Sequence, residues 1–559
     1  MKRRDFFKIT TPLAASPFLL NGVPLKAFDT SHLLQDVNCD GIEDRVIVLI
    51  ELNGGNDGFN TLVQMDQYDI YANLRPNLRI PENAVIPLDT TLAVPDQVGL
   101  HPAMTNFKSL YDEGKVNIVR AVSYDTPTLS HFKGMHIWAM GGDGTPENSS
   151  YQTGWMGRYL ESVYPDIENI PQNLLPDPLG IQVGFGVPST GFLTSVNYPI
   201  SVNMSGQNPS NYFTLVSEVG GAPPSNIPMS QYGQELAYLA EIERSTNRYS
   251  ARITEVFEQG TNTIQYSQNN LANQLKTVAR LLSGGSKTKV FMVRFGGFDT
   301  HHAQVTASDT TVGAHADLLA KLSDSVKAFM DDLVGLGLDD KVLAVTVSEF
   351  GRRAYQNGSL GTDHGSLAPM FVFGKGVEPG IVGTNPNLNN LDSNGLVANP
   401  QHDYRQVLTT ILQDWLGSAD EVVEDTFWGD FLSQKLPIIN ENHIVEPSCY
   451  ISDLTPTGMM TALNNDADVE DKIGADVKLF PNPAKDFFYI EMTAEEMSEG
   501  TFYLFNSLGQ AIKTLKLHIE PGRNKIPINI RNIAAGIYTV QMMADGVPLF
   551  TKQQVIVSE

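Results

Sequence analysis

Cysteine is almost absent from this sequence. Cys39 and Cys449 are the only two cysteines in 559 residues. A thiol-based zinc cluster is therefore excluded. In an exported protein the two cysteines can form one disulfide that closes the large domain, and two unpaired thiols are the alternative that the sequence leaves open.

Positive charge and long apolar runs are also scarce. The chain has 38 Lys and Arg residues against 63 Asp and Glu residues, which gives a formal net charge of -25. Such a surface repels phosphate backbones and anionic lipid, so we expect no nucleic-acid partner. The hydrophobic fraction of 42% with 18% charged residues is typical of a folded, soluble chain, and we expect no transmembrane span in the mature protein.

The N-terminus has the pattern of an export signal. Arg3 and Arg4 stand directly before two phenylalanines and a lysine, and a moderately apolar stretch follows over residues 9–23. This start resembles a twin-arginine signal, and an ordinary secretory signal is the alternative. Two prolines interrupt the apolar stretch, which is too short for a stable membrane helix. We expect an export signal over residues 1–27 and a polar leader over 28–44.

The polar leader contains a run of oxygen-bearing side chains. Asp36, Asn38 and Asp40 alternate with other residues and precede a glycine, as at the start of a calcium loop. The twelfth position is Ile47, where a calcium loop has a bidentate Glu. Calcium binding at these three residues and a solvated acidic turn are both consistent with the pattern.

The C-terminal segment has short alternating strands separated by Pro, Asn and Gly turns, which is the pattern of a small β-sandwich. Residues 477–486, 502–510 and 533–540 resemble the C-terminal sorting domain of the type IX secretion system of Bacteroidetes. We expect this domain over residues 475–559, after a linker at 451–474. The resemblance implies recognition by the type IX secretion machinery, removal of the domain, and release or attachment at the outer cell surface. A carbohydrate-binding β-sandwich is the alternative.

The large central region alternates between apolar runs and helical patterns. Continuous β-branched runs predict strands that are covered on both faces, and strands alternating with helices predict an α/β sandwich with a mostly parallel sheet. Ligands of such sheets gather beyond the carboxyl ends of the strands. The expected strands are 45–52, 116–122, 290–295, 342–348 and 370–373, and the expected helices are 231–246, 264–282 and 313–336.

Metal-ligating side chains follow three of these expected strands. Asp57 lies in a glycine-rich turn after the first strand, Asp299 comes after the strand at 290–295, and Glu349 comes after the strand at 342–348. Carboxylates and imidazoles at one sheet edge are ligands suited to zinc or another transition metal. Each turn taken singly is equally consistent with solvated structural polar groups, but their convergence predicts a metal site.

Histidines accompany these carboxylates. His301 and His302 follow Asp299, and His364 follows Asp363 after a loop. Adjacent histidines seldom bind one ion together, so we expect one of His301 and His302 to be a ligand and the other to support it. We favour His302 as the ligand.

An ordered set of motifs resembles the bacterial DUF1501 family, whose fold is similar to that of the alkaline phosphatase superfamily. The resemblance covers most of residues 45–420 and implies an alkaline phosphatase-like domain over 45–450. The motifs are Leu-Asn-Gly-Gly-Asn-Asp-Gly at 52–58, Ser-His-Phe at 130–132, Gly-Gly-Phe-Asp-Thr-His at 296–301, Ser-Glu-Phe-Gly-Arg at 348–352, Thr-Asp-His-Gly at 362–365 and Asp-Tyr-Arg at 403–405.

The superfamily resemblance implies one or two divalent metals, with zinc the favoured ion. Asp57 and Glu349 would bind one metal, whereas Asp299, His302 and His364 would bind the other. The superfamily commonly has an Asp-His pair where this chain has Glu349 and Phe350, so one imidazole is missing unless Asp363 or another residue replaces it. The list of expected metal ligands is therefore Asp57, Asp299, His302, Glu349, Asp363 and His364.

The same resemblance implies catalytic roles. Ser130 is the candidate nucleophile, because a metal lowers the pKa of a coordinated hydroxyl. His131 would orient the ester, and Arg352 would bind its non-bridging oxygens in a bidentate manner. The Cys/Ser-x-Pro-x-Arg pattern of formylglycine-dependent sulfatases is missing, so that chemistry is not expected.

Two functions of different classes remain open. One is an exported metal-dependent hydrolase of phosphate or related anionic esters, acting on small or glycan-linked substrates. The other is a non-catalytic cell-surface binding protein with a degenerate metal site.

Overall fold

The protein is described here by a computed structural model, which divides into two units, Met1–Thr455 and Pro456–Glu559. Two short N-terminal strands, β1 (Phe18–Leu20) and β2 (Val23–Leu25), pair with each other. The other residues described are 45–145, 153–164, 176–184, 189–194, 200–204, 249–397, 400–427, 429–445 and most of 477–556. Outside the described residues lie both cysteines, the calcium-like run, the rest of the expected export signal, the expected helix at 231–246 and the expected linker at 451–474.

The described part of the large unit is built on one sheet with strand order β15-β7-β14-β11-β3-β10-β8-β9, and β16 pairs with the end of β7. Every pairing in this sheet is parallel except those of β14 with β11 and with β7. The mostly parallel sheet expected from the sequence is thus confirmed. Its strands are β3 (Val46–Asn53), β7 (Val116–Ser123), β8 (Gly180–Val183), β9 (Ser201–Met204), β10 (Val290–Gly296), β11 (Val342–Val347), β14 (Ala368–Phe373), β15 (Gly380–Val382) and β16 (His402–Asp403).

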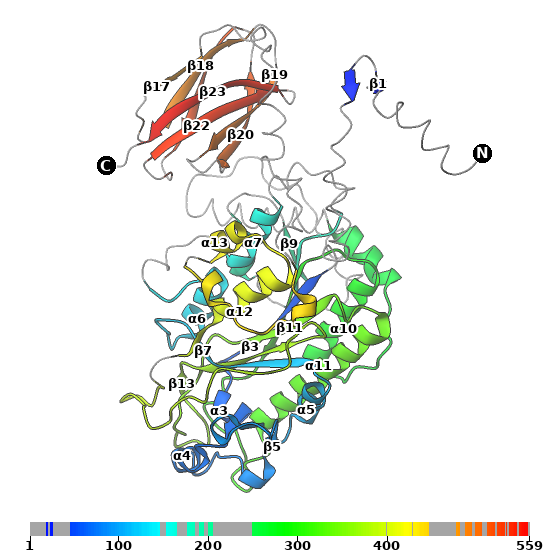
Figure 1. Ribbon diagram of the computed structural model, residues 1–559, viewed down its shortest axis with the longest axis vertical. Helices are drawn as coiled ribbons and strands as arrows, with labels where there is room; N and C mark the ends of the chain where they lie inside the picture. Colours follow the sequence, from blue (N-terminus) through cyan, green and yellow to red (C-terminus); the bar gives the residue numbers. More distant parts are fainter. Residues whose placement is uncertain are drawn as a thin grey trace, which may run out of the picture. The chain divides into compact units, whose positions relative to one another are not determined.

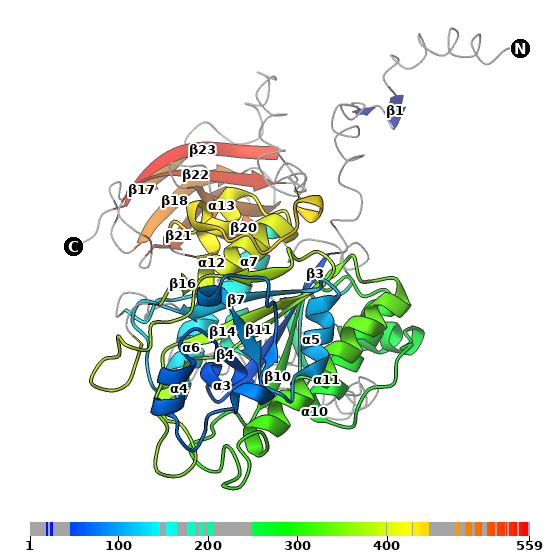
Figure 2. The same cartoon turned by 60° about the horizontal axis from the view of Figure 1, so that its bottom comes forward.

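Helices cover both faces of this sheet (Figures 1 and 2). Successive side chains of a strand point to opposite faces, and β3 accordingly gives Val48 and Ile50 to one hydrophobic core but Ile47 and Leu49 to the other. The first core also contains α5 (Thr105–Asp112), α10 (Asn270–Ser283) and α11 (Ala314–Leu336). The second contains α6 (His131–Met140), α7 (Trp155–Val163), α12 (Tyr404–Thr410), the π-helix η7 (Ile411–Trp415) and α13 (Asp420–Thr426).

The expected helices agree with α10 and α11 except at one end. We expected the first of them to begin at residue 264, but α10 begins at Asn270. The side chain of Asn269 accepts a hydrogen bond from the backbone N–H of Ala272, and such an N-cap fixes the start of a helix.

Smaller elements fill the region between β3 and β7 and the segment after β11. A second small sheet has the order β4-β6-β5, and β12 pairs with β13. These elements are α3 (Gly58–Thr61), β4 (Leu62–Gln64), α4 (Tyr68–Leu74), β5 (Ile86–Pro87), β6 (Val98–Leu100), β12 (Gly351–Arg352) and β13 (His364–Gly365), with 3-10 helices η2 (Glu82–Ala84), η3 (Val94–Asp96), η8 (Leu432–Gln434) and η9 (Glu441–His443). A further 3-10 helix, η6 (Thr190–Phe192), lies between β8 and β9.

The C-terminal unit consists of two antiparallel sheets, β17-β18-β21 and β20-β19-β22-β23. Phe488 and Ile528 from the first sheet share one core with Phe502 and Val540 from the second, as in a β-sandwich. Among the described residues, no helix has the length and apolar character needed to cross a membrane. The strands are β17 (Lys478–Phe480), β18 (Phe487–Ala494), β19 (Ser498–Phe505), β20 (Ala511–Ile519), β21 (Gly522–Asn529), β22 (Gly536–Ala544) and β23 (Val547–Ile556).

Candidate metal centre

Four parallel strands, β7, β11, β3 and β10, end at the same edge of the large sheet. The segments that follow them carry the polar motifs found in the sequence. His131 begins α6 in the segment after β7, Asp299 and His301 follow β10, and His364 lies in β13, which pairs with the segment directly after β11. We call these four residues the His-Asp cluster.

The cluster is centred on one carboxylate oxygen. The Nε2 atoms of His131, His301 and His364 lie 3.4, 3.2 and 3.3 Å from Asp299 Oδ1. His301 Nε2 lies 2.8 Å from His364 Nε2. The ligand atoms of His131, Asp299 and His364 all lie within 4.8 Å of one another.

Two of the histidines are held from outside the cluster at Nδ1. His364 Nδ1 lies 2.7 Å from the backbone oxygen of Leu129, and His301 Nδ1 lies 3.1 Å from Asp363 Oδ1. A carbonyl and a carboxylate can only accept hydrogen bonds, so each Nδ1 carries the proton. In the neutral rings the Nε2 lone pairs therefore face each other across 2.8 Å, and this arrangement is repulsive unless a proton or a metal cation lies between them.

The third histidine is held by a buried carboxylate. His131 Nδ1 donates to Glu349 Oε1 over 2.7 Å, and the same oxygen accepts from the backbone N–H of Gly54 over 2.8 Å. The hydrogen bond that His131 donates to Glu349 is the main cause that raises the pKa of His131. A carboxylate behind a histidine fixes the ring and its tautomer, which is the usual arrangement around metal ligands.

Arg352 supports the central carboxylate. Its Nη2 donates to Asp299 Oδ1 over 2.7 Å. Burial by itself would raise the pKa of Asp299, but the hydrogen bond and charge of Arg352 outweigh it and lower this pKa to about 2. The oxygen at the centre of the cluster is thus an ionised one.

The expected role of Arg352 in binding ester oxygens disagrees with this structure. Its side chain is fully buried, and Nε, Nη1 and Nη2 each donate to backbone carbonyls. Gly54, Gly55, Phe298 and Thr362 supply these carbonyls. A guanidinium held in this way cannot reach a substrate.

The donor set of the cluster fits a divalent transition metal. The three nitrogen-to-oxygen separations of 3.2 to 3.4 Å match the spacing of about 3.3 Å between ligands at about 2.0 Å from a tetrahedral zinc, whereas the 2.8 Å between His301 Nε2 and His364 Nε2 is shorter. His131 Nε2 is buried and has no hydrogen-bond partner among the described residues. The side chains of Asp299 and His301 are 48% and 43% exposed, so solvent and solutes reach the cluster.

Four of the six expected ligands do not lie in the cluster, namely Asp363, Glu349, His302 and Asp57. Asp363 and Glu349 stand behind His301 and His131, at hydrogen-bond distance from their Nδ1 atoms. His302 is exposed, and His301 takes the place that we expected for it. Of the two histidines, His301 has its Nε2 at 3.2 Å from Asp299 Oδ1, and His302 has no such contact among the described residues.

Asp57 forms an ion pair with an arginine and does not join the metal-ligating residues. Arg75 Nη1 and Gln304 Nε2 each donate to Asp57 Oδ2 over 2.6 Å, and the side chains of Asp57 and Arg75 are fully buried. Burial favours the neutral acid, yet the charge of Arg75 prevails and lowers the pKa of Asp57. The expected pair of Asp57 with Glu349 therefore does not form a second metal site in the described part of the chain.

This buried ion pair predicts a stability effect. Arg75→Met leaves the Asp57 carboxylate buried without its counter-ion, and breaking a buried pair in this way costs about 3 to 5 kcal/mol of the free energy of unfolding. Arg79→Met is the matched control, because Arg79 is exposed. Urea unfolding of both variants measures the difference, and a loss under about 1 kcal/mol for Arg75→Met would contradict the prediction.

Ser130 stands at the N-cap of α6, directly before His131. It is exposed, and its hydroxyl makes no capping bond to the helix. The motif that carries Ser130 and His131 thus reaches the cluster through its histidine. The backbone oxygen of Leu129, which holds His364, was missed because a carbonyl has no signature in the sequence.

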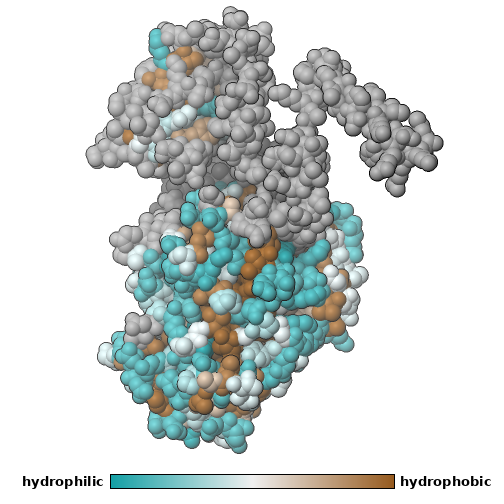
Figure 3. Space-filling view, in the orientation of Figure 1, coloured by the Kyte–Doolittle hydropathy of each residue, from teal (hydrophilic) through white to brown (hydrophobic). Residues whose placement is uncertain are grey.

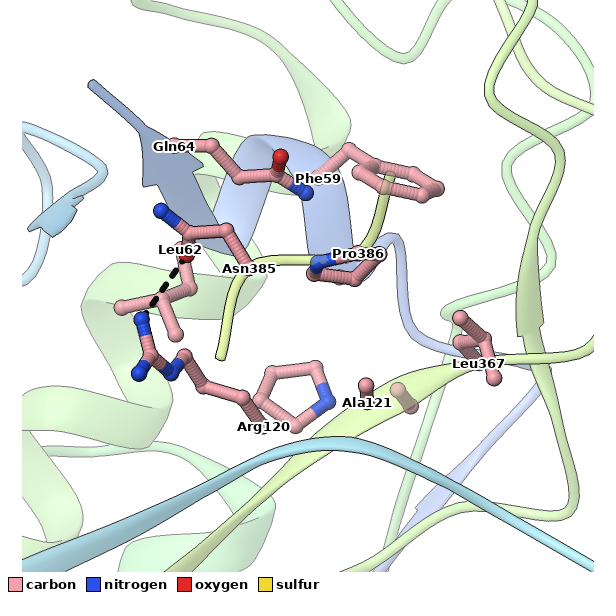
Figure 4. A pocket seen from close by; sticks show the side chains of 11 residues that line it. Phe59, Leu62, Gln64, Arg120, Ala121, Leu367, Asn385 and Pro386 are labelled. Carbon is pink, nitrogen blue, oxygen red and sulfur yellow. Dashed lines mark hydrogen bonds between the residues drawn. The ribbon is translucent and has the colours of Figure 1, made fainter. Parts of the chain in front are cut away.

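A small pocket elsewhere in the large unit contains none of the cluster residues. It lies between α3, β4, β7 and the start of β14, and its lining includes Phe59, Arg120 and Asn385 (Figure 4). Arg120 Nη1 donates to Asn385 Oδ1 over 3.0 Å.

Comparison with protein families gives two matches. Residues 254–423 match the family described as "Protein of unknown function (DUF1501)", and residues 478–558 match the "Secretion system C-terminal sorting domain". The chain contains a DUF1501 domain and a sorting domain. The sorting domain indicates handling by the secretion machinery and export, with surface attachment or release. The comparison with curated proteins found no match.

Solved structures similar to this chain include three enzymes. A sulfatase from Pseudoalteromonas sp. is 8% identical, with a TM-score of 0.33 over 90% of this chain and 87% of that one. The alkaline phosphatase of the Antarctic bacterium TAB5 is 12% identical, with a TM-score of 0.25 over 60% of this chain and 92% of that one. The lipoteichoic acid synthase LtaP of Listeria monocytogenes is 9% identical, with a TM-score of 0.26 over 67% of this chain and 77% of that one. PorU from Porphyromonas gingivalis is matched over 15% of this chain and 9% of its own length, at 15% identity and a TM-score of 0.14.

Proposed function

We propose that this protein is an exported metal-dependent hydrolase of phosphate or related anionic esters, with one divalent metal in the His-Asp cluster. One observation carries the proposal. Three imidazole Nε2 atoms and an ionised carboxylate oxygen converge at a solvent-exposed edge of the sheet, with their outer partners holding the rings in place.

In this proposal some residues bind the metal and others orient the histidine rings. His131, Asp299 and His364 would hold the metal, and His301 would add a third nitrogen on the more exposed side. Glu349, Asp363 and the Leu129 carbonyl keep each Nδ1 protonated, so that each Nε2 presents a lone pair. A bound divalent metal supplies positive charge that polarises a phosphoryl oxygen. Imidazole and carboxylate ligands favour zinc.

Ser130 is the proposed nucleophile. Its hydroxyl is exposed, makes no capping bond and lies one residue from His131. The Ser130 hydroxyl loses its proton to solvent, and its oxygen forms a bond to phosphorus while the bond from phosphorus to the ester oxygen breaks. The departing alcohol takes a proton from solvent, and water then hydrolyses the serine ester to release phosphate.

Chelation and metal restoration test the proposed function. Purified protein should hydrolyse an aryl phosphate, lose this activity after treatment with a chelator and regain it when zinc is added back. An aryl sulfate tested beside it shows whether related esters are also cleaved. Equal rates before and after complete metal removal would contradict the proposal.

A binding role is the second candidate, and the burial of Arg352 favours it. The expected guanidinium for ester oxygens is bonded to backbone carbonyls, so the cluster lacks that source of charge. A protein that binds one metal tightly but hydrolyses no phosphate, phosphonate or sulfate ester would establish the binding role instead.

The sorting domain predicts a separable effect on export. A chain that lacks residues 471–559 should fold in its large unit but remain inside the cell, because a small domain with its own core can be removed without disturbing the other unit. Fractionation of cells and medium measures this, with full-length His364→Ala as a control that should still be exported. Normal surface delivery of the truncated chain would refute the prediction.

A further inference from the structure

Two exposed apolar side chains flank the first histidine of the cluster. Phe132 is 92% exposed and Leu129 is 36% exposed. The face of the large unit seen in Figure 3 is mostly hydrophilic, with apolar residues in smaller patches. A phenylalanine ring left almost wholly in water forgoes a large gain from burial, so its position beside a functional cluster suggests a contact that forms on binding.

The segment that carries these side chains is tied to the cluster at two points. The backbone oxygen of Leu129 accepts a hydrogen bond from His364 Nδ1 over 2.7 Å. His131 contributes its Nε2 to the cluster and its Nδ1 to Glu349. Phe132, the next residue, stands in the first turn of α6 and makes no ring contact with any residue that the structure describes.

The neighbouring charge completes the pattern. Lys133 is exposed and forms no ion pair with the described residues, although the whole chain has a net charge of -25. A free cation in this helical turn favours an anion nearby. Lys133 stands two residues after His131 in α6 and therefore faces another side of the helix, so it adds positive charge to this segment without pointing along His131.

We propose that Phe132 is a specificity-determining residue that packs against a ring in the alcohol part of the ester. The substrates are then phosphate or related anionic esters of ring-bearing alcohols, and esters of small chain alcohols bind less tightly. This inference rests on the proposed function, because the cluster must first hold the anionic group. The contact resembles the offset stacking by which aromatic side chains recognise flat apolar faces.

Binding of two phosphonates tests the inference without requiring turnover. Zinc-loaded wild-type protein is titrated by calorimetry with phenylphosphonate and with methylphosphonate, which share the anionic group and differ in the ring. We expect about tenfold tighter binding of phenylphosphonate, the gain that burial of part of an aromatic ring gives. Phe132→Ala should bring the two affinities together and leave that for methylphosphonate unchanged.

Val334→Ala is the matched control. Val334 is 47% exposed near the end of α11, which belongs to the core on the other face of the sheet, so its loss should leave the tenfold preference intact. Equal affinities in the wild type, or a preference that survives Phe132→Ala, would overturn the inference and leave the proposed function standing. Failure to bind either phosphonate would overturn both.

Discussion

Replacing His364 by alanine should remove metal and hydrolytic activity together. Its Nε2 lies 3.3 Å from Asp299 Oδ1 and 2.8 Å from His301 Nε2, so it is close to two other members of the proposed ligand set. Without it an ion loses a ligand, and we expect metal affinity to fall at least ~100-fold. Elemental analysis after gel filtration and turnover of an aryl phosphate measure the two losses.

Substitutions of the adjacent histidines His301 and His302 provide a matched pair of tests for the proposed metal ligands. His301→Ala should weaken metal binding, because His301 Nε2 faces Asp299 Oδ1 at 3.2 Å. His302→Ala should leave metal content and activity unchanged, because that side chain is exposed outside the cluster. The reverse result, or normal metal content in His364→Ala, would refute the proposed ligand set.

Ser130→Ala should lower turnover of an aryl phosphate at least ~100-fold while metal content stays the same. The covalent route depends on the serine oxygen, whereas every proposed metal ligand remains in place. The substitution should not weaken α6, because the Ser130 side chain makes no capping bond to that helix. Unchanged unfolding in urea is therefore the control for folding.

Full activity of Ser130→Ala would eliminate the serine as nucleophile. Hydrolysis would then proceed by direct attack of water on phosphorus. No phosphorylated protein would form during turnover. Mass spectrometry of wild-type protein quenched during turnover separates the two routes, since the serine route predicts a phosphate group on Ser130.

The sequence predicted the sheet well because buried strands leave a strong local signal. The apolar runs at 45–52, 290–295 and 342–348 correspond to β3, β10 and β11, and their parallel alignment brings the following polar segments to one edge. The presence of Asp299 at that edge follows from strand position, whereas His364 reaches the edge through the pairing of β13 with β12 after a loop. For a residue that directly follows a strand, its position in the sequence was sufficient to predict the edge of the sheet at which it lies.

The finer arrangement depends on contacts that have no local signal. Arg75 follows α4 and reaches Asp57 only in the folded chain, so nothing in the glycine-rich turn indicated that an arginine would neutralise its carboxylate. The resemblance implied that Arg352 binds ester oxygens, yet its guanidinium lies buried among backbone carbonyls. The choice between His301 and His302 likewise depends on the direction of a bend, which spacing does not determine.

The metal content of purified full-length protein tests the central claim most directly. The structure offers one group of inward-facing imidazoles and a carboxylate among the described residues, whereas Asp57 is neutralised by Arg75. Inductively coupled plasma mass spectrometry should find about one transition-metal ion per chain in the wild type and far less than one in His364→Ala. No stoichiometric metal in wild-type protein after loading with zinc, or equal metal in both proteins, would contradict the account.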